Sequence, residues 1–392
     1  MFKQILNYAL LSAGISLPLS VLLFAYAQEE TSTIQNTRTM QIEQTKSFDS
    51  KPHIQVAILL DTSSSMSGLI NQTRTEIWSV VNALSEAQKD NVSPTLEIAL
   101  YEYGQTSLPF WSRQIRQVNS FTTDLDQLSE SLFSLTTNGG EEYSGAVIGK
   151  AAHDLLWSDK EDDLKVIIIA GNESFAQGPV PYQSAIEQAK GKNIIINTIH
   201  CGNRDVGMQD QWNTGAKLGK GEYFAIDHNQ EVIYVETPFD DEISDLNLEL
   251  NDTYLPYGVR GSSGKQRQQA EDMNSYTNRT AYVSRSLSKS SAYYNNDSWD
   301  IVDAAKKSSF SLSDIQEDDL PNVMRNKTLK EKQTIINEYK EKRDRIKQRM
   351  AELKKKRAQY LRDQSSASDE ITLGNAIIQA LRKQAAQRSF IL

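Results

Sequence analysis

One short segment carries side chains that could hold a cation: Asp61, Ser63 and Ser65 alternate along Asp61-Thr62-Ser63-Ser64-Ser65. A hard divalent cation such as Mg²⁺ takes oxygen ligands in an octahedron. A carboxylate followed by two hydroxyls at alternate positions can face one such ion, directly or through water. Three ligands leave the coordination shell open, so a carboxylate from a partner could complete it. The alternative is a purely structural role for this segment as a strand-to-helix cap, because Asp and Ser are favoured caps.

Two elements must hold this loop. Residues 54–60 are a short apolar run that ends at Asp61, and residues 67–89 form a helical pattern with one apolar face. Further apolar strands are expected at 96–101, 166–170, 194–199 and 223–226, with helical patterns at 124–135, 145–156, 182–190 and 208–218. This alternation predicts an α/β fold, a doubly wound and mostly parallel sheet covered on both faces. Asn172 and Glu173 follow the strand at 166–170, at the carboxyl edge where such sheets bind ligands.

The order of these motifs resembles the von Willebrand factor type A family over about residues 54–230. The motifs are a strand, then Asp61-Thr62-Ser63-Ser64-Ser65-Met66, a long helix, Gly139-Gly140 leading into Ser144-Gly145-Ala146-Val147-Ile148, and the strand at 166–170. The resemblance implies a Rossmann-like sheet with a metal-ion-dependent adhesion site (MIDAS). It also implies a protein that binds other proteins and does not catalyse a reaction.

Two positions depart from the family pattern. The family usually has Thr after the glycine pair, where this chain has Glu141 and Glu142, and Asp after the fourth strand, where it has Asn172 and Glu173. Both departures keep oxygen ligands, although a Glu could instead occupy the partner's place. We therefore expect Mg²⁺, or else Ca²⁺ or Mn²⁺; the added carboxylates make Ca²⁺ more plausible here than at the family's usual site. The expected metal-ligand set is Asp61, Ser63, Ser65, Glu141 or Glu142, and Asn172 or Glu173.

The segments before and after the predicted sheet domain differ from it in composition. Lys3, an uncharged stretch at 5–27 and Ala25-Tyr26-Ala27 predict a signal peptide at 1–27 and export to the periplasm or cell exterior. The alternative is an uncleaved membrane anchor. A polar linker at 28–52 precedes the sheet domain at 53–235. After it we expect a mixed helical extension at 236–325, a basic coiled-coil helix at 326–364 with an apolar a/d seam, and an amphipathic helix at 365–392.

Composition excludes several classes of function. The net charge is −9, so nothing points to nucleic acid, and the basic helix should dock on the acidic remainder of the chain. Cys201 is the only cysteine, which excludes a disulfide framework. His200 and Cys201 are neighbours on an expected strand and point to opposite faces, which disfavours a Cys/His nucleophile pair. The five tryptophans are expected to be core or half-buried. We expect a metal-dependent protein-binding module and no enzyme. The alternatives are a metal-free envelope scaffold and a hydrolase built on Glu141, Glu142 and Glu173.

Overall fold

The computed structural model describes residues 51–227, 229, 234–364 and 372–391. The predicted signal peptide, and all but the last two residues of the predicted linker, lie outside the described residues. Within the described part of the chain, no helix combines the length and apolar character needed to cross a membrane.

Six strands form one sheet in the order β3-β2-β1-β4-β5-β6. Neighbouring strands run parallel, except that β3 is antiparallel to β2. The strands are β1 (His53–Asp61), β2 (Thr95–Tyr103), β3 (Ile115–Thr122), β4 (Leu164–Gly171), β5 (Ile195–Cys201) and β6 (Lys220–Ile226). The predicted α/β class and mostly parallel sheet are confirmed. The edge strand β3 was not predicted, because only Ile115 and Asn119 of its side chains are buried and it therefore lacks an apolar run.

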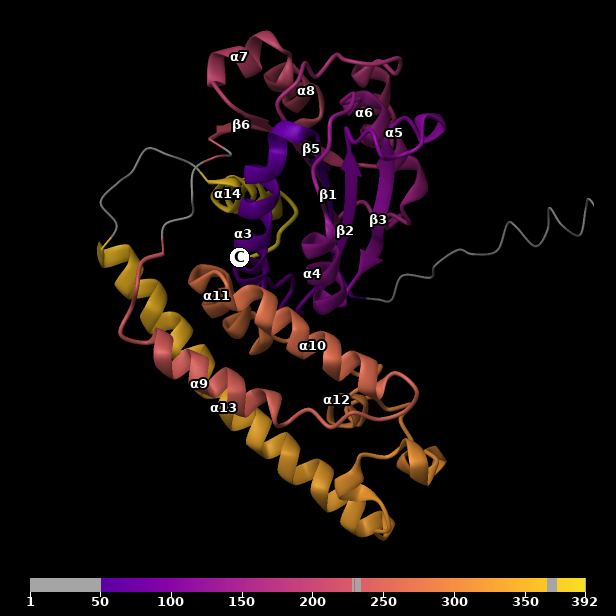
Figure 1. Cartoon of the computed structure of the whole chain (residues 1–392), viewed down its shortest axis with the longest axis vertical. Coiled ribbons are helices and arrows are strands. Elements are labelled where there is room, and N and C mark those ends of the chain that lie inside the picture. Colours follow the sequence, from indigo (N-terminus) through magenta and orange to yellow (C-terminus); the bar gives the residue numbers. More distant parts are fainter. Residues whose placement is uncertain (1–50, 228, 230–233, 365–371, 392) are drawn as a thin grey trace, which may run out of the picture. The chain divides into compact units, whose positions relative to one another are not determined.

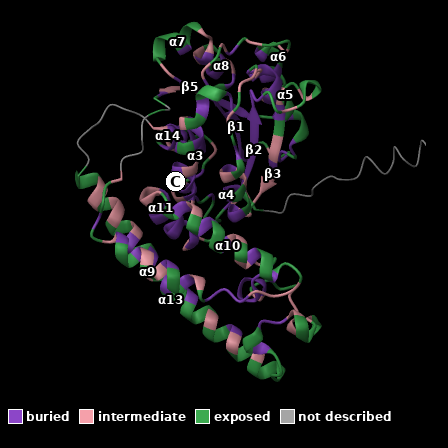
Figure 2. Cartoon of the chain, in the orientation of Figure 1, coloured by how far each residue is buried: buried purple, intermediate pink, exposed green. Residues whose placement is uncertain are grey.

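Helices cover both faces of the sheet (Figure 1). Alternate side chains of β1 enter different cores: Ile54, Val56 and Ile58 pack toward one face, and Ala57 and Leu59 toward the other. Every residue of β1 is buried, which explains why the strand reads as an unbroken apolar run (Figure 2). The helices of this region are α3 (Ser67–Leu84), α4 (Leu125–Ser134), α5 (Ser144–Asp154), α6 (Tyr182–Gly191), α7 (Arg204–Gln209) and α8 (Trp212–Leu218).

Two helix predictions in this region were too long. The helix expected at 67–89 ends at Leu84. The one expected at 208–218 is two helices, because Gln211 has a left-handed backbone (φ 71°) that interrupts α-helical geometry. The prediction for the tryptophans holds for four of the five. Trp111 is the exception, with 85% of its surface exposed.

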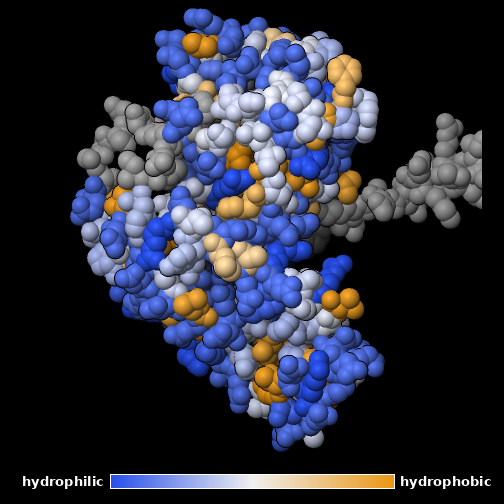
Figure 3. Space-filling model, viewed as in Figure 1, coloured by the Kyte–Doolittle hydropathy of each residue, from blue (hydrophilic) through white to orange (hydrophobic). Residues whose placement is uncertain are grey.

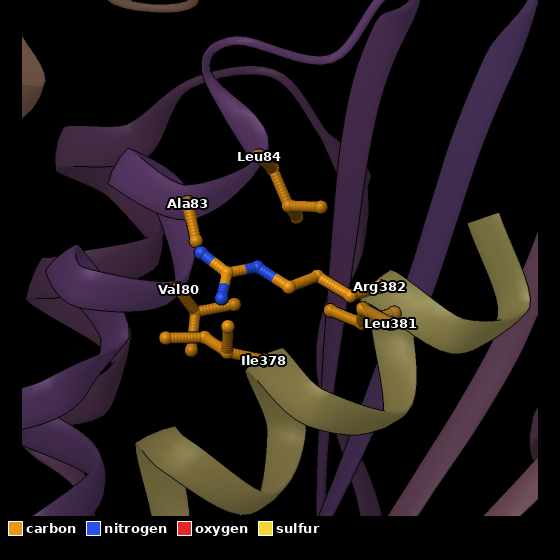
Figure 4. Close-up of a pocket in the computed structure, with 6 residues that line it drawn as sticks. All are labelled: Val80, Ala83, Leu84, Ile378, Leu381 and Arg382. Atoms are coloured by element: carbon orange, nitrogen blue, oxygen red, sulfur yellow. The ribbon is translucent and has the colours of Figure 1, made fainter. Parts of the chain in front are cut away.

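The C-terminal helix α14 (Leu373–Gln387) packs on α3 and on the sheet. Figure 4 shows Ile378, Leu381 and Arg382 of α14 facing Val80, Ala83 and Leu84 of α3. The backbone N–H of Leu373 donates to Gln72 Oε1 (3.3 Å), and that of Gly374 donates to Glu76 Oε2 (2.6 Å). Helix α14 thus belongs to the same apolar core as β1 and α3.

Between β6 and α14 lies the helical extension. It contains α9 (Asp240–Asn251), α10 (Gly261–Tyr276), α11 (Arg279–Lys289), α12 (Ile301–Ala304) and α13 (Leu329–Gln364). Helices α10 and α11 are separate, because the Asn278 side chain caps a new helix by accepting from the Ala281 N–H. The short helix α12 is capped by Asp300, whose side chain accepts from the Asp303 N–H (2.9 Å).

Helix α13 is one continuous helix, as the heptads predicted. Its buried residues all lie at a or d positions of the heptad register that begins with Leu329 at a: Ile336, Arg343, Ile346, Met350 and Leu353. It packs against α9, α11 and α12. Its cations meet acidic partners: Arg343 lies 2.7 Å from Asp300 with both side chains fully buried, and Arg357 lies 2.8 Å from Asp240. The prediction that the basic helix docks on the acidic remainder is confirmed.

Candidate metal centre

Asp61 is the last residue of β1 and has no exposed surface. One of its carboxylate oxygens, Oδ1, accepts from the Ser63 N–H (2.8 Å). The chain then turns through Ser64–Met66, and fully buried Met66 anchors the turn before α3 begins. Ser63 Oγ and Ser65 Oγ lie 3.4 Å apart, so the two hydroxyls of the predicted loop do face a common point.

Glycines on both neighbouring strands make room for this carboxylate. Gly104, just after β2, has φ +81°, and a Cβ there would lie 2.9 Å from Asp61 Oδ1 and 2.9 Å from Glu142 Cγ. Gly171 ends β4, and its Cβ would lie 3.1 Å from Asp61 Oδ2. Side chains at these positions would fill the space around the Asp61 carboxylate. Below it, the Tyr103 hydroxyl donates to the Ala170 carbonyl (3.0 Å) and joins β2 to β4.

The second loop, residues 135–143 between α4 and α5, brings Glu142 to the same place. The Asn138 N–H donates to the Thr62 carbonyl (3.0 Å), which fixes this loop against the first. Glu142 is buried, with 7% of its surface exposed. Glu141 is exposed, and its carboxylate instead accepts from the Gln177 amide (3.1 Å).

The third loop supplies Asn172. Its side-chain amide donates to Ser65 Oγ (3.2 Å), so it reaches the first loop directly. Glu173 is exposed, but its charge is close enough to raise the pKa of both Asp61 and Glu142. The structure therefore brings together Asp61, Ser63, Ser65, Glu142 and Asn172, with Glu173 nearby.

The two acids of the cluster are buried, and burial disfavours their charged forms. Burial raises the pKa of Asp61 to about 7, against hydrogen bonds from Ser63 that lower it. Burial, followed by repulsion from Asp61, also raises the pKa of Glu142 to about 7. Asp61 Oδ2 and Asn172 Oδ1 are buried without a hydrogen-bond partner among the described residues. Unsatisfied buried oxygens are costly, and a cation would satisfy both.

These residues fit a divalent cation that prefers oxygen. The donors are two carboxylates, two hydroxyls and an amide oxygen, which is the ligand chemistry of Mg²⁺ or Ca²⁺. Within the described residues, no group of three or more His, Cys, Asp or Glu side chains converges as a metal site. The fit therefore depends on Ser63, Ser65 and Asn172 as well as on the two acids. Gly104 and Tyr103 were not predicted as parts of the site, although both follow from the position of β2 beside β1.

Comparison with known proteins gives one family and several similar structures. The model of the von Willebrand factor type A domain matches residues 55–221. BatB, a conserved hypothetical protein from Bacteroides thetaiotaomicron, is 16% identical over 44% of this chain and 90% of that chain, with a TM-score of 0.34. The von Willebrand domain of the type V pili tip protein Mfa5 from Porphyromonas gingivalis is 14% identical over 45% of this chain and 90% of that chain, with a TM-score of 0.32.

A third similar structure is proximal thread matrix protein 1 from the mussel byssus, with a zinc-occupied MIDAS motif. It is 11% identical over 45% of this chain and 41% of that chain, with a TM-score of 0.31. No curated protein matches this chain. The family match spans β1 to the start of β6 and includes all three loops of the candidate metal centre. Residues 55–221 are a von Willebrand factor type A domain.

Proposed function

We propose that this chain is an exported protein-binding module that uses a divalent cation to hold a carboxylate of its partner. The ligands of the cation are Asp61, Ser63, Ser65, Glu142 and Asn172. The observation that carries the proposal is the buried, unpaired Asp61 Oδ2 beside buried Glu142, where the pKa of each acid is raised to about 7. Two acids in this position repel each other unless a cation neutralises them.

The ion is Mg²⁺, with Ca²⁺ or Mn²⁺ as the alternatives. These side chains supply at most five direct ligands if each gives one oxygen, and an octahedral ion accepts six. The open position takes the carboxylate of a protein partner, so the chain binds and does not catalyse. Export is proposed from Lys3, the uncharged stretch at 5–27 and Ala25-Tyr26-Ala27. Retention of that stretch would anchor the protein to the membrane.

Thermal melting tests the metal site. Wild type and Asp61→Ala are each melted with EDTA, Mg²⁺, Ca²⁺ or Mn²⁺. An ion at a hundredfold excess over its Kd stabilises the folded state by about 2.7 kcal/mol, and Asp61→Ala should lose that gain. In EDTA the variant should melt close to wild type, because removing a buried carboxylate with one unpaired oxygen offsets the loss of the hydrogen bond from the Ser63 N–H.

Asp241→Ala is the matched control, since Asp241 is an exposed acid outside the cluster. It should keep the full metal-dependent shift. A wild type that melts identically with and without metal would contradict the proposed site and leave the scaffold alternative. A shift that survives Asp61→Ala would place the ion elsewhere.

A further inference from the structure

Two aromatic side chains stand in solvent on the loop between β2 and β3. Phe110 is 83% exposed and Trp111 is 85% exposed, whereas each of the other four tryptophans is at most 8% exposed. On the face drawn in Figure 3, the surface is mostly hydrophilic, with apolar side chains in small groups. Tryptophan and other aromatic residues are enriched in the energetic centres of protein interfaces.

The loop that carries them has a fixed shape. The Ser112 N–H donates to the Pro109 carbonyl (3.0 Å), and the Arg113 N–H donates to the Phe110 carbonyl (2.9 Å). Arg113 and Gln114 both have left-handed backbones (φ 55°). Each such non-glycine residue costs about 1–2 kcal/mol, so surrounding contacts must hold the turn in place. The two aromatic side chains are therefore displayed on a defined turn.

Those contacts come from the second loop of the metal centre. The Gln114 side-chain oxygen accepts from the Glu141 N–H (2.7 Å), and the Thr106 N–H donates to the Gly139 carbonyl (2.7 Å). Glu141 directly precedes Glu142, a proposed metal ligand. The aromatic loop and the second loop of the metal centre are thus joined by two hydrogen bonds, which fix one loop against the other.

We propose that Phe110 and Trp111 form the apolar half of the partner-binding surface. This inference rests on the proposed function and adds the chemistry of the partner. The partner is a protein that presents one carboxylate to the cation and, beside it, an apolar patch that receives the two aromatic side chains. Exposed Glu141 and Glu173 next to the site disfavour an anionic lipid surface.

The test uses the full chain loaded with Mg²⁺ and a displayed library of short random peptides as the probe. Selected peptides should pair Asp or Glu with apolar residues. Binding is followed by acrylamide quenching of tryptophan fluorescence, because Trp111 is the exposed tryptophan and bound peptide should shield it. The Phe110→Ser/Trp111→Ser double variant should weaken binding by about tenfold or more, measured with labelled peptide. Met273→Ser, at an exposed position (74%) on α10, is the matched control and should bind like wild type.

The outcomes separate this inference from the metal function. Peptides whose Kd is unchanged in the double variant but lost in Asp61→Ala would overturn the aromatic surface and leave the metal site standing. Peptides that need Phe110 and Trp111 but neither metal nor Asp61 would overturn the proposed function, and with it the joint site. Failure to enrich any Mg²⁺-dependent peptide would overturn both. Trp111-dependent binding to phosphatidylglycerol vesicles would assign the aromatic pair to lipid instead.

Discussion

Arg285 of α11 lies 2.8 Å from Asp126 of α4, and neither side chain is more than 3% exposed. The same guanidinium lies 2.7 Å from Asp272 of α10 and 4.8 Å from the ring of Trp78 on α3. One cation from the helical extension is therefore paired, inside the protein, with an acid of the sheet domain. The two regions share this ion pair as well as apolar contacts.

Arg285→Met should be strongly destabilising, because it leaves the carboxylates of Asp126 and Asp272 buried with fewer partners. Loss of one member of a buried ion pair costs about 3–5 kcal/mol, which urea unfolding would measure. Arg279→Met on the same helix is the control. Its partner Asp241 is 91% exposed, so the change should cost less than about 1 kcal/mol. Equal losses in the two variants would contradict a special role for the buried pair.

Replacing Ile346 and Leu353 of α13 with Asp should unfold the helical extension. Both side chains are buried in the seam, and each substitution would bury an unpaired charge. Circular dichroism and thermal melting give the result. Gln348→Asp with Lys355→Asp, at exposed positions of the same helix, should leave the melting curve nearly unchanged. A seam variant that melts like wild type would show that α13 does not depend on this face.

Gly104→Ala should abolish metal-dependent stabilisation. The new Cβ would lie 2.9 Å from Asp61 Oδ1, and φ is +81°. Gly258→Ala separates the two effects, because Gly258 also has a left-handed backbone (φ +65°) but no atom within 4 Å of the added Cβ. Both variants should lose about 1–2 kcal/mol from backbone strain. Melting with EDTA and with Mg²⁺ should show a metal-dependent shift in Gly258→Ala alone.

Glu76→Gln should alter the pH dependence of stability. Burial raises the pKa of Glu76 above its usual value in the folded protein, so the acid prefers its neutral form there. Its contribution is complete below the unfolded-state pKa and is lost as pH rises through the raised folded-state value. Across the pH range from the unfolded-state pKa of Glu76 up to its raised folded-state value, wild type should therefore lose stability relative to Glu76→Gln. Parallel urea midpoints for the two proteins across this range would contradict the raised pKa.

Much of the sheet could be predicted because its parallel strands are buried on both faces and read as apolar runs. Strand β3 was not predicted, because an edge strand with half-exposed side chains has no such apolar run. The surface on which α14 packs could not be predicted from the local sequence pattern of that helix. An amphipathic helix shows that one face is covered, but the covering surface here lies some three hundred residues earlier in the chain.

The candidate site was partly predictable for a similar reason. Asp61, Ser63 and Ser65 lie in one loop, so their spacing was enough to predict that their side chains lie close together. Gly104 acts through the register that pairs Asp61 with Tyr103, which is a property of two strands and not of one segment. A glycine directly after a neighbouring parallel strand was the available signal. Trp111 was predicted to be at least half-buried because most tryptophans are, and its sequence neighbours give no sign that its loop faces solvent.

The position of α14 also affects the order in which parts of this protein can fold during synthesis. One face of the sheet gains part of its cover from residues 373–387, so that part of the face stays uncovered until residue 387 has been synthesised. Contacts between segments so distant in sequence form slowly. The core of the sheet domain is therefore completed only after the whole helical extension has been made.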